Sequence, residues 1–458
     1  MSHSPDQVDA VRIVRQRSEH NVSRKHMDPD AVRVMYRLMR NGFTAYLVGG
    51  GVRDLLLGHK PKDFDVATNA HPRQIRKLFR NSFLIGRRFR LVHIRFGDKV
   101  IETSTFRRRP DPTEAPPAEA GGPENLYQDM DNTFGTPEED AWRRDFTINA
   151  LFYDIGTFAI IDHVNGLQDL QDRLIRTIGD SDERFQEDPV RMVRAVRFAA
   201  RLGFRIERET YAGIMRHHGH LALAAPPRML EEIYKLFPYS AAEAAFRLLR
   251  RTRLLAVMFP ELDAFLDRSG HETMLFWKHL AGLDRREHEE GKPPDAALIF
   301  AVLFYGLFLE TLRVEQRQDD VVRHAGIVRT IFEPAAQRYR MPKRVFYHTI
   351  QLLDGQRRFE NLGNRFSKRF AAHEIFEDAL ALRRIHLLAS GGDLATLDPW
   401  VALRAEVLRD QPADHADTDG RRSRRRGGRR RRQGAPGDGF EGDAGESAES
   451  EAPAPLPE

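Results

Sequence analysis

The residues of this chain best placed to do chemistry are two aspartates separated by one residue, Asp63 and Asp65. They flank Phe64 in a segment with the pattern of a β-strand. Because side chains alternate between the two faces of a strand, both carboxylates are expected on the same face. Two adjacent carboxylates favour a divalent cation with oxygen ligands, so the pair predicts a metal site.

A run of three glycines, residues 49–51, precedes the two aspartates. It follows an apolar strand predicted over residues 45–48 and leads into a short helix that opens with Val52 and Arg53. Glycines between a strand and a helix let backbone N–H groups converge on an anion, which suits a triphosphate. Arg53 would add positive charge in the first turn of this helix.

A third carboxylate is a candidate for the same metal site. Two strands are predicted over residues 91–96 and 99–106, joined by a tight turn, and Glu102 lies in the second of them. If this strand adjoins the one that carries Asp63, three carboxylates converge. Glu102 is therefore a candidate metal ligand.

Charged residues also stand in front of an apolar segment further along the chain. Arg143, Arg144 and Asp145 directly precede an apolar pattern over residues 146–152. A charged helix surface would give the same pattern. We favour a functional role because core packing of the apolar residues would hold the two arginines and the aspartate rigidly.

A basic helix is predicted up to Gly203, with Asp188 as its N-cap and Pro189 in the first helical position. One arc of this helix carries four arginines, which are Arg191, Arg194, Arg197 and Arg201. A basic stripe is usually a solvated surface. This one begins beside two carboxylates, and such a mixture can hydrogen-bond the edges of a base and its phosphates.

Two weaker signals follow the basic helix. In a helix predicted over residues 226–237, Arg228 lies one turn from Glu231 or Glu232 and is placed to brace the basic helix. Between the two helices, residue types that bind metals gather at His217, His218 and His220. Their spacing fits no closed metal site, and a polar helix end explains them better.

The composition limits the class of protein. The 458 residues are enough for two or more domains, 41% of them are hydrophobic, and the formal net charge is +5. Cysteine is absent, which excludes disulfides and thiolate metal sites. No signal peptide is evident, and the longest apolar run, residues 296–309, is shorter than the roughly 20 residues that span a membrane. We expect a buried helix there, and a soluble, cytoplasmic protein without a membrane partner.

Three further segments are predicted to form a loop, a nucleic-acid-binding region and a hairpin or hinge. Residues 107–124 are rich in Pro, Ala, Gly and Glu and are predicted to form a mobile surface loop that covers the site. Residues 241–410 interleave basic and aromatic residues, which suits single-stranded nucleic acid, although core packing explains most of the aromatics. An Asn-Gly pair in the segment from residue 160 predicts a hairpin or a hinge between domains.

The C-terminal tail is expected to be disordered. It holds a cationic tract followed by an acidic end, residues 434–458. The arginines are expected to bind RNA phosphates, and they are Arg421, Arg422, Arg424, Arg425, Arg426, Arg429 and Arg430, with two more beside them. The acidic end could fold back on the tract and compete with RNA.

Four of these motifs occur in the order typical of one family. The segments LVGGGVRD, DFD, RRDFTINAL and EDPVRMVRAVRFAARLGF resemble those of the class II nucleotidyltransferases of the polymerase-β-like superfamily. That group holds bacterial poly(A) polymerases and tRNA CCA-adding enzymes. The segments LIGRRFRLVHIRF and DNTFGTPEEDAWRRDFTINAL look like the poly(A) polymerase branch.

The resemblance implies an α+β fold with helical domains after the sheet. Residues 28–156 would form a polymerase-β-like head with a small mixed sheet, 157–240 a helical neck that selects the base, and 241–410 a helical body that holds RNA. Residues 1–27 are expected to be a flexible N-terminus and 411–458 the disordered tail.

The resemblance also implies metal chemistry. Two Mg²⁺ ions on Asp63 and Asp65, for which Mn²⁺ can substitute, would lower the pKa of an RNA 3′-hydroxyl and stabilise the pyrophosphate leaving group. Asp145 matches the aspartate that the family counts as its third catalytic carboxylate. On geometry, Glu102 has a comparable claim, and Asp145 could instead orient the ribose or Arg143 and Arg144. The sequence leaves both possibilities open.

The nucleotide contacts implied by the resemblance cover several motifs. The triphosphate would meet the glycine turn at Gly49 and Gly50, and Arg53, while Arg143 or Arg144 would contact the nucleotide. Asp188 and Arg191 would read the adenine edge, with Arg194 and Arg197 near the phosphates.

These features predict a template-independent adenylyltransferase that adds AMP from ATP to RNA 3′ ends, in polyadenylation and RNA decay, with RNA-decay proteins as possible partners of the tail. A CCA-adding enzyme is the first alternative, since it would share the catalytic motifs. A catalytically silent RNA-binding module is the second, against which the intact aspartate pair and glycine turn argue.

Overall fold

The computed structural model describes residues 12–86, 91–108, 133–268, 270–316, 324–363 and 365–410. The chain divides into two units, residues 1–407 and 408–458. The predicted loop beyond Arg108 and the arginine-rich tail lie outside the described residues.

An eight-stranded mixed sheet forms the first half of the described chain, with the strand order β1-β8-β7-β2-β3-β6-β5-β4. Strands β3 and β6 are parallel and the other pairs are antiparallel. The strands are β1 (Ile13–Arg15), β2 (Ala45–Val48), β3 (Asp65–Thr68), β4 (Ser82–Ile85), β5 (Leu91–Phe96), β6 (Lys99–Thr105), β7 (Leu151–Asp154) and β8 (Ile160–Asp162). The predicted α+β class with a mixed sheet is confirmed.

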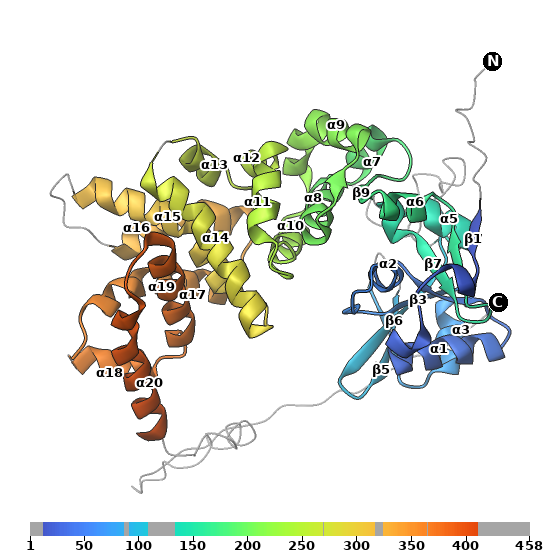
Figure 1. Cartoon of the computed structure of the whole chain (residues 1–458), viewed down its shortest axis with the longest axis horizontal. Coiled ribbons are helices and arrows are strands. Elements are labelled where there is room, and N and C mark those ends of the chain that lie inside the picture. The colour runs from blue at the N-terminus through green and yellow to red at the C-terminus, as the bar shows by residue number, and fades with distance from the viewer. Residues whose placement is uncertain are drawn as a thin grey trace, which may run out of the picture. The chain divides into compact units, whose positions relative to one another are not determined.

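Helix α1 (Pro29–Arg40) packs on strands β2 and β3, and Figure 1 shows it beside the sheet with α3 (Pro72–Leu78). Asp28 caps the start of this helix by accepting from the N–H of Asp30 at 2.8 Å. The buried face of α1 presents Val34, Met35 and Leu38 to the apolar core.

The N-terminal segment differs from its prediction. Residues 12–27 were expected to be flexible, but β1 pairs with β8 at one edge of the sheet. Val22 and Met27 are buried in the core and anchor the segment. The polar composition of this segment concealed those two apolar anchors.

Two boundaries near the glycine run also differ. Helix α2 (Gly50–Leu56) begins two residues earlier than predicted, with Gly49 as its N-cap. Strand β3 begins at Asp65, so the prediction that Asp63 lies within the strand is wrong.

The Asn-Gly pair starts a helix and does not form a hairpin turn, whereas the hinge between domains stays a prediction. Asn165 has φ 61° and precedes helix α6 (Gly166–Gln171). A Cβ at Gly166 would lie 2.2 Å from the carbonyl oxygen of Thr147, so this position requires glycine. The buried Asp162 carboxylate accepts from backbone N–H groups of this turn, those of Val164, Gly166 and Leu167, at 2.9 to 3.0 Å.

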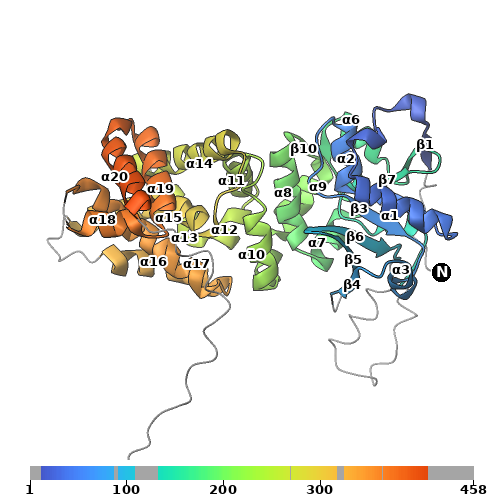
Figure 2. The same ribbon diagram turned by 90° about the horizontal axis from the view of Figure 1, so that it is seen from below.

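The central helices connect the sheet to the all-helical second half. They are α7 (Ser181–Glu187), α8 (Val190–Leu202), α9 (Arg208–His217) and α10 (Pro226–Tyr234), with a two-stranded sheet of β9 (Leu174–Ile175) and β10 (Arg205–Ile206). Helix α5 (Pro137–Trp142) lies earlier in the chain, between β6 and β7. Figure 2 shows α8 with α11 (Ala242–Arg251) on its side away from the large sheet. Gly203 ends α8 with φ 66°, as predicted, whereas the N-cap is Pro189 rather than Asp188.

The α-helices of the remaining helical part are α12 (Leu254–Met258), α13 (Pro260–Leu266), α14 (His271–Glu290), α15 (Ala296–Gln316), α16 (His324–Arg338), α17 (Lys343–Gly355), α18 (Arg365–Ala372), α19 (Phe376–Ser390) and α20 (Asp398–Asp410). Among them, α15 packs against α13, α14, α16, α17 and α19. Within the described residues, α15 alone is long and apolar enough to cross a membrane, but 67% of its most apolar window is buried inside the protein. The expected buried helix is confirmed.

Two histidines are buried together in this helical half. His279 of α14 is fully buried, and its Nε2 lies 3.2 Å from Nδ1 of His386 on α19. Burial and the neighbouring His386 lower the pKa of His279 to about 3. Burial, Arg383 and His271 lower the pKa of His386 to about 4. Both side chains are therefore neutral in the folded protein at pH 7.

We expect this pair to make the fold sensitive to acid. Unfolded histidines titrate near 6.5, so the unfolded chain binds more protons than the folded one between pH 6.5 and pH 4, and stability falls as the pH falls through that range. Each histidine contributes about 2 kcal/mol, so the loss from pH 7 to pH 5 should be about 4 kcal/mol. The thermal midpoint of His279→Leu should depend less on pH than that of the wild type. The exposed control His59→Gln should retain the wild-type dependence, and parallel curves for His279→Leu and wild type would contradict the prediction.

Candidate active site

The turn between β2 and α2 is fixed by Gly49. Its φ of 68° and ψ of −132° favour glycine, and a Cβ there would lie 2.9 Å from Nη1 of Arg144. The N–H of Gly49 donates to the carbonyl oxygen of Leu151 on β7 at 3.1 Å. The turn is therefore hydrogen-bonded to the sheet and lies close to Arg144, a predicted nucleotide-binding residue.

Arg144 is held in place from three sides. Its Nε and Nη2 donate to one carboxylate oxygen of Asp140 at 3.1 and 2.9 Å, and its Nη1 donates to the carbonyl oxygen of Asn149 at 3.1 Å. Its guanidinium also lies 5.4 Å from the centre of the Phe152 ring. The carbonyl oxygen of the neighbouring Arg143 accepts from Arg184.

Arg53 is almost fully buried and organises the other side of the turn. It donates twice to Asp54 Oδ1, at 2.8 and 2.6 Å, and once to the side-chain oxygen of Asn149, at 2.6 Å. The second carboxylate oxygen of Asp54 accepts from Arg201 on α8 at 2.7 Å. Asp54 thus joins α2 to α8. The triphosphate contact of Arg53 stays a prediction.

The register of the parallel strands places two carboxylates side by side. Val66 pairs with Thr103, so Asp65 at the start of β3 is next to Glu102 on β6. Burial and the charge of Glu102 raise the pKa of Asp65 to about 6. Asp63 raises it further by a smaller amount, and Arg144 lowers it. Glu102 also lies 3.5 Å from Nε2 of His93. The strand of Glu102 therefore adjoins the strand that begins at Asp65, as expected.

This group of carboxylates suits a hard divalent cation. All its donors are oxygens, and burial together with the charges of Glu102 and Asp63 raises the pKa of Asp65. Within the described ranges, no three His, Cys, Asp or Glu side chains form a ready-made metal site. The residues therefore fit Mg²⁺ by donor type and charge, and the assignment of Asp63, Asp65 and Glu102 as ligands stays a prediction.

Asp145 is engaged by an arginine of α8. Its carboxylate accepts from Nε of Arg194 at 2.7 Å, from Nδ2 of Asn149 at 3.1 Å and from the N–H of Phe146 at 2.9 Å. Burial alone would raise its pKa, but Arg194 and these hydrogen bonds hold the pKa at about 2. The arginine that Asp145 contacts on α8 is Arg194, and the catalytic role of Asp145 stays a prediction.

Glu232 of α10 supports the same arginine face of α8. It lies 3.5 Å from Nη1 of Arg194 and 3.2 Å from Nε of Arg197. Burial lowers the pKa of Arg197 to about 10, although Glu232 opposes this shift, and Glu232 with Asp145 raises the pKa of Arg194. The stripe expected to be a solvated surface or a ligand site is therefore partly a buried ion-pair network. Bracing of α8 by α10 through Glu232 is confirmed.

The start of α8 carries the predicted base-reading pair. The Asp188 carboxylate accepts from the N–H of Val190 at 3.2 Å and from Arg228 of α10 at 2.5 Å. Arg191 donates to Glu187 at 2.7 Å, and its Nε lies 3.9 Å from Asp188. An acceptor and a donor are thus fixed next to each other.

One cavity of about 420 Å³ brings most of these groups together. The predicted residues that line it are Gly49, Gly50, Arg53, Asp65, Arg144, Asp145, Asp188, Arg191 and Arg194. Asp63, Glu102, Arg143 and Arg197 are not among its lining residues, while Asn149, Phe198, Arg201 and Arg228 are.

Two organising residues were missed by sequence reasoning. Asp54 ends the motif LVGGGVRD and Asn149 lies within RRDFTINAL, but neither was assigned to the site, because their partners Arg201 and Arg53 are far away in sequence. Arg201 and Arg228 were noted on their helices but were not assigned to the site. An acidic residue directly after Arg53 was the one available signal for Asp54.

Comparison with known proteins decides the family. Residues 45–176 match a family model described as the poly A polymerase head domain, and residues 203–266 match one described as a probable RNA and SrmB-binding site of polymerase A. Poly(A) polymerase I of Escherichia coli O6:H1 is 38% identical over 429 residues, which cover 92% of this chain and 92% of that protein. The chain belongs to the poly(A) polymerase family. It is an enzyme of that family, a nucleotidyltransferase of the poly(A) polymerase type, as the motifs predicted.

Further relatives agree with this membership. Poly(A) polymerase I of Salmonella typhi is 38% identical over 84% of both chains. A CCA-adding enzyme of Lactobacillus helveticus is also 38% identical, but over 49% of this poly(A) polymerase family member and 53% of the relative. The solved CCA-adding enzyme of Bacillus stearothermophilus in complex with CTP has 26% identity and a TM-score of 0.59, covering 84% of this chain and 82% of its own. The family fold is thereby confirmed.

Glu232 is expected to act as a positioning residue for the arginines of α8. Glu232→Gln removes the charge that balances Arg194 and Arg197 and should lower the free energy of unfolding by about 3 kcal/mol. With the arginines displaced, kcat/KM for the preferred nucleotide should fall about tenfold relative to the other nucleotides. Thermal unfolding and single-nucleotide kinetics measure the two effects.

The neighbouring Glu231 provides the matched control on the same helix. Its side chain is 65% exposed and pairs with Lys235 at the surface. Glu231→Gln should leave both quantities unchanged. Wild-type nucleotide discrimination in Glu232→Gln would refute the positioning role.

Proposed function

We propose that this enzyme adds AMP from ATP to RNA 3′ ends without a nucleic-acid template and releases pyrophosphate. The observation that carries the proposal is one cavity lined both by Asp65 of the carboxylate group and by the pair Asp188 and Arg191. The first suits a metal-bound triphosphate, and the second suits the edge of a base. Family membership supports the same reaction.

Base selection is assigned to the start of α8. Adenine offers a donor, its amino group, beside an acceptor nitrogen on one edge. The carboxylate of Asp188 can accept the first and the guanidinium of Arg191 can donate to the second. Because Arg228 and Glu187 fix these two side chains, the protein itself would act as the template.

The arginines that line the cavity would bind the phosphates. Arg144 and Arg194 are held by Asp140 and Asp145, so their positions are set before a nucleotide arrives. Fixed cations of this kind stabilise negative charge that develops on a leaving pyrophosphate. Gly49 and Gly50 would let the chain approach the triphosphate closely.

Divalent metal ions complete the proposed chemistry. Bound on Asp63 and Asp65, two Mg²⁺ ions, or Mn²⁺ in their place, would lower the pKa of the RNA 3′-hydroxyl, hold the triphosphate and stabilise the pyrophosphate. Asp65 and Glu102 share the negative charge that such ions neutralise. We assign Glu102 as the third metal ligand and give Asp145 the role of orienting Arg194 toward the nucleotide.

The wider role follows from the same assignment. We assign residues 28–156 to the head, 157–240 to the neck and 241–410 to the body that holds RNA, and we place the enzyme in the cytoplasm in mRNA polyadenylation and RNA decay. The model that matches residues 203–266 describes RNA and SrmB binding. This description supports RNA and protein partners at that region, in addition to RNA-decay proteins at the tail.

Addition of CCA to tRNA is the alternative reaction. A CCA-adding relative matches about half of this chain, whereas a poly(A) polymerase relative matches 92% of it. The long match favours adenylation.

Incubation of the purified enzyme with Mg²⁺ and single nucleotides tests the proposal. ATP alone should give long tails on an unstructured RNA, and CTP alone should give none. Asp63→Asn and Asp65→Asn should each lower the rate by at least about a hundredfold because the metal ligands are removed. The exposed Asp98→Asn serves as the control with unchanged activity. Addition that stops after CCA on a tRNA lacking its end would instead establish the alternative.

The arginine-rich tract, which lies outside the described residues, is proposed to bind RNA phosphates. Deletion of residues 411–458 should weaken RNA binding at low salt and reduce the slope of log K against log salt by about 0.7 for each phosphate that the shortened chain no longer binds. Deletion of residues 434–458 alone keeps the arginines and should tighten binding if the acidic end competes with RNA. An unchanged slope in the longer deletion would show that the tract does not bind phosphate.

A further inference from the structure

A second and larger cavity lies in the helical half of the chain. It has a volume of about 780 Å³ and is enclosed by the 3-10 helix η6 (Gln356–Glu360), α18 and α20. This volume is within the roughly 300 to 1,000 Å³ typical of small-molecule sites. None of its lining residues lines the active-site cavity. It is therefore a separate site.

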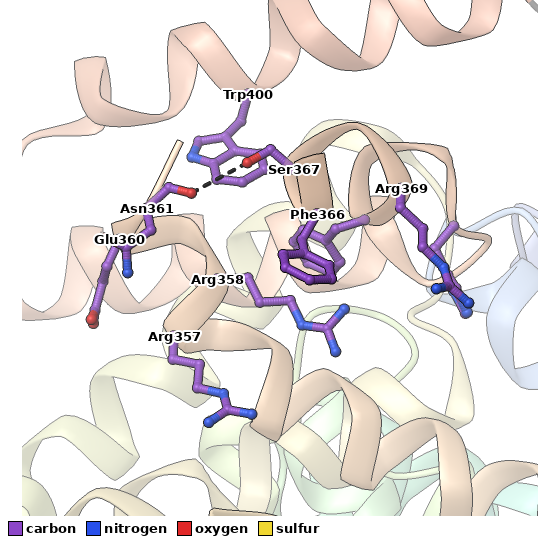
Figure 3. Close-up of a pocket in the computed structure, with 10 residues that line it drawn as sticks. Arg357, Arg358, Glu360, Asn361, Phe366, Ser367, Arg369 and Trp400 are labelled. Atoms are coloured by element: carbon purple, nitrogen blue, oxygen red, sulfur yellow. Dashed lines mark hydrogen bonds between the residues drawn. The ribbon is translucent and has the colours of Figure 1, made fainter. Parts of the chain in front are cut away.

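Three exposed arginines give this cavity a positive charge. Figure 3 shows the guanidinium of Arg358 below the ring of Phe366, with Arg357 and Arg369 on either side. Glu360 is the one acidic residue among the lining residues. Three cations against one anion suit a phosphodiester.

The arginines of this cavity are less engaged than others in the same half of the chain. Arg357 has a 55% exposed side chain and lies 3.5 Å from Asp354. In the part of the chain that the structure describes, Arg358 and Arg369 form no ion pair. By contrast, Arg338 is bound to Glu261 and Arg404 to Glu377, at 2.9 to 3.1 Å. The side chains around the cavity therefore keep donors for a ligand.

An exposed aromatic ring lies over these arginines. The side chain of Phe366 is 59% exposed, although a ring of this size is usually buried in a folded protein. Its neighbour Phe370 is buried, with the Arg358 guanidinium 5.2 Å from the ring centre. An exposed ring beside cations is the arrangement on which nucleic-acid bases stack.

The floor of the cavity is rigid. Phe370 packs against Trp400 with ring centroids 5.9 Å apart, and Phe359 packs against the same indole at 5.2 Å. The indole N–H of Trp400 donates to the carbonyl oxygen of Phe359 at 3.3 Å, which ties α20 to η6. These contacts fix the buried rings beneath the cavity, next to which Phe366 is exposed.

We propose that this cavity binds an internal nucleotide of the RNA substrate, upstream of the 3′ end. The base stacks on Phe366, and the flanking phosphates bind Arg357, Arg358 and Arg369. The ligand is single-stranded RNA, because a base within a duplex has no free face for stacking. This inference rests on the proposed function in that RNA is the substrate, and it adds a second point of attachment away from the reaction.

Fluorescence anisotropy with the full chain and a 5′-labelled 20-nucleotide oligo(A), without ATP, tests the site. Arg358→Ala combined with Arg369→Ala should weaken binding at least tenfold and reduce the slope of log K against log salt by about 1.4. Phe366→Ala should weaken binding about tenfold with an unchanged slope, and Phe366→Trp should restore wild-type binding. These side chains are exposed, so the fold should persist, which thermal unfolding checks.

Lys368 provides the matched control for charge. It lies on the same helix α18, does not line the cavity and pairs with Glu406 at the surface. Lys368→Ala should bind RNA as the wild type does. An equal effect of Lys368→Ala and of the arginine substitutions would overturn the site, because it would reduce the effect to overall charge. Wild-type binding by Phe366→Ala would overturn it as well and leave a site for anions only.

The reaction itself provides a separate readout. Extension of a four-nucleotide primer, too short to reach a second site while its end reacts, should proceed in the cavity variants with wild-type KM for ATP. If the enzyme proved to add nucleotides other than AMP, the proposed reaction would fail while the anisotropy result would still decide the RNA site. A loss of short-primer activity equal to the loss with the long RNA would refute the separate attachment.

Discussion

The ion pair between Asp145 and Arg194 is the interaction on which the arrangement of the active site depends. Burial disfavours the charge of each group when it is alone, and each restores the charge of the other. The pair connects the segment before β7 to α8, and Glu232 continues the connection to α10. These ion pairs within the protein thus hold in place the segments that would bind the nucleotide, before any substrate is present.

The charges around the cavity are sorted by position. The carboxylates of Asp65 and Glu102 lie on neighbouring strands of the sheet, whereas two arginines, one beside the glycine turn and one on α8, each pair with an aspartate. In the proposed complex, the metal ions of a nucleoside triphosphate would meet the carboxylates and its phosphates would meet the arginines. Asp54 serves both sides, since it accepts from Arg53 within α2 and from Arg201 on α8.

Local signals in the sequence identified the elements of the site, and contacts between distant segments determined their details. The glycine turn and the adjacency of Glu102 to Asp65 followed from strand alternation and the expected neighbouring strand. The roles of Asp54 and Asn149 could not be inferred, because each depends on side chains that approach from other elements of the fold. The Asn-Gly pair was misread since its glycine is required by the nearby Thr147 carbonyl, a contact that turn statistics do not contain.

The double role of Asp54 has a consequence for engineering. An exchange of α8 and α10 between relatives would transfer the arginines and Glu232 together but leave Asp54 behind in the sheet-bearing part. A recipient without an acid at that position would receive Arg201 as an unpaired cation at a crowded boundary. Hybrids designed to change nucleotide choice should therefore choose their crossover points by charge partners instead of by domain borders.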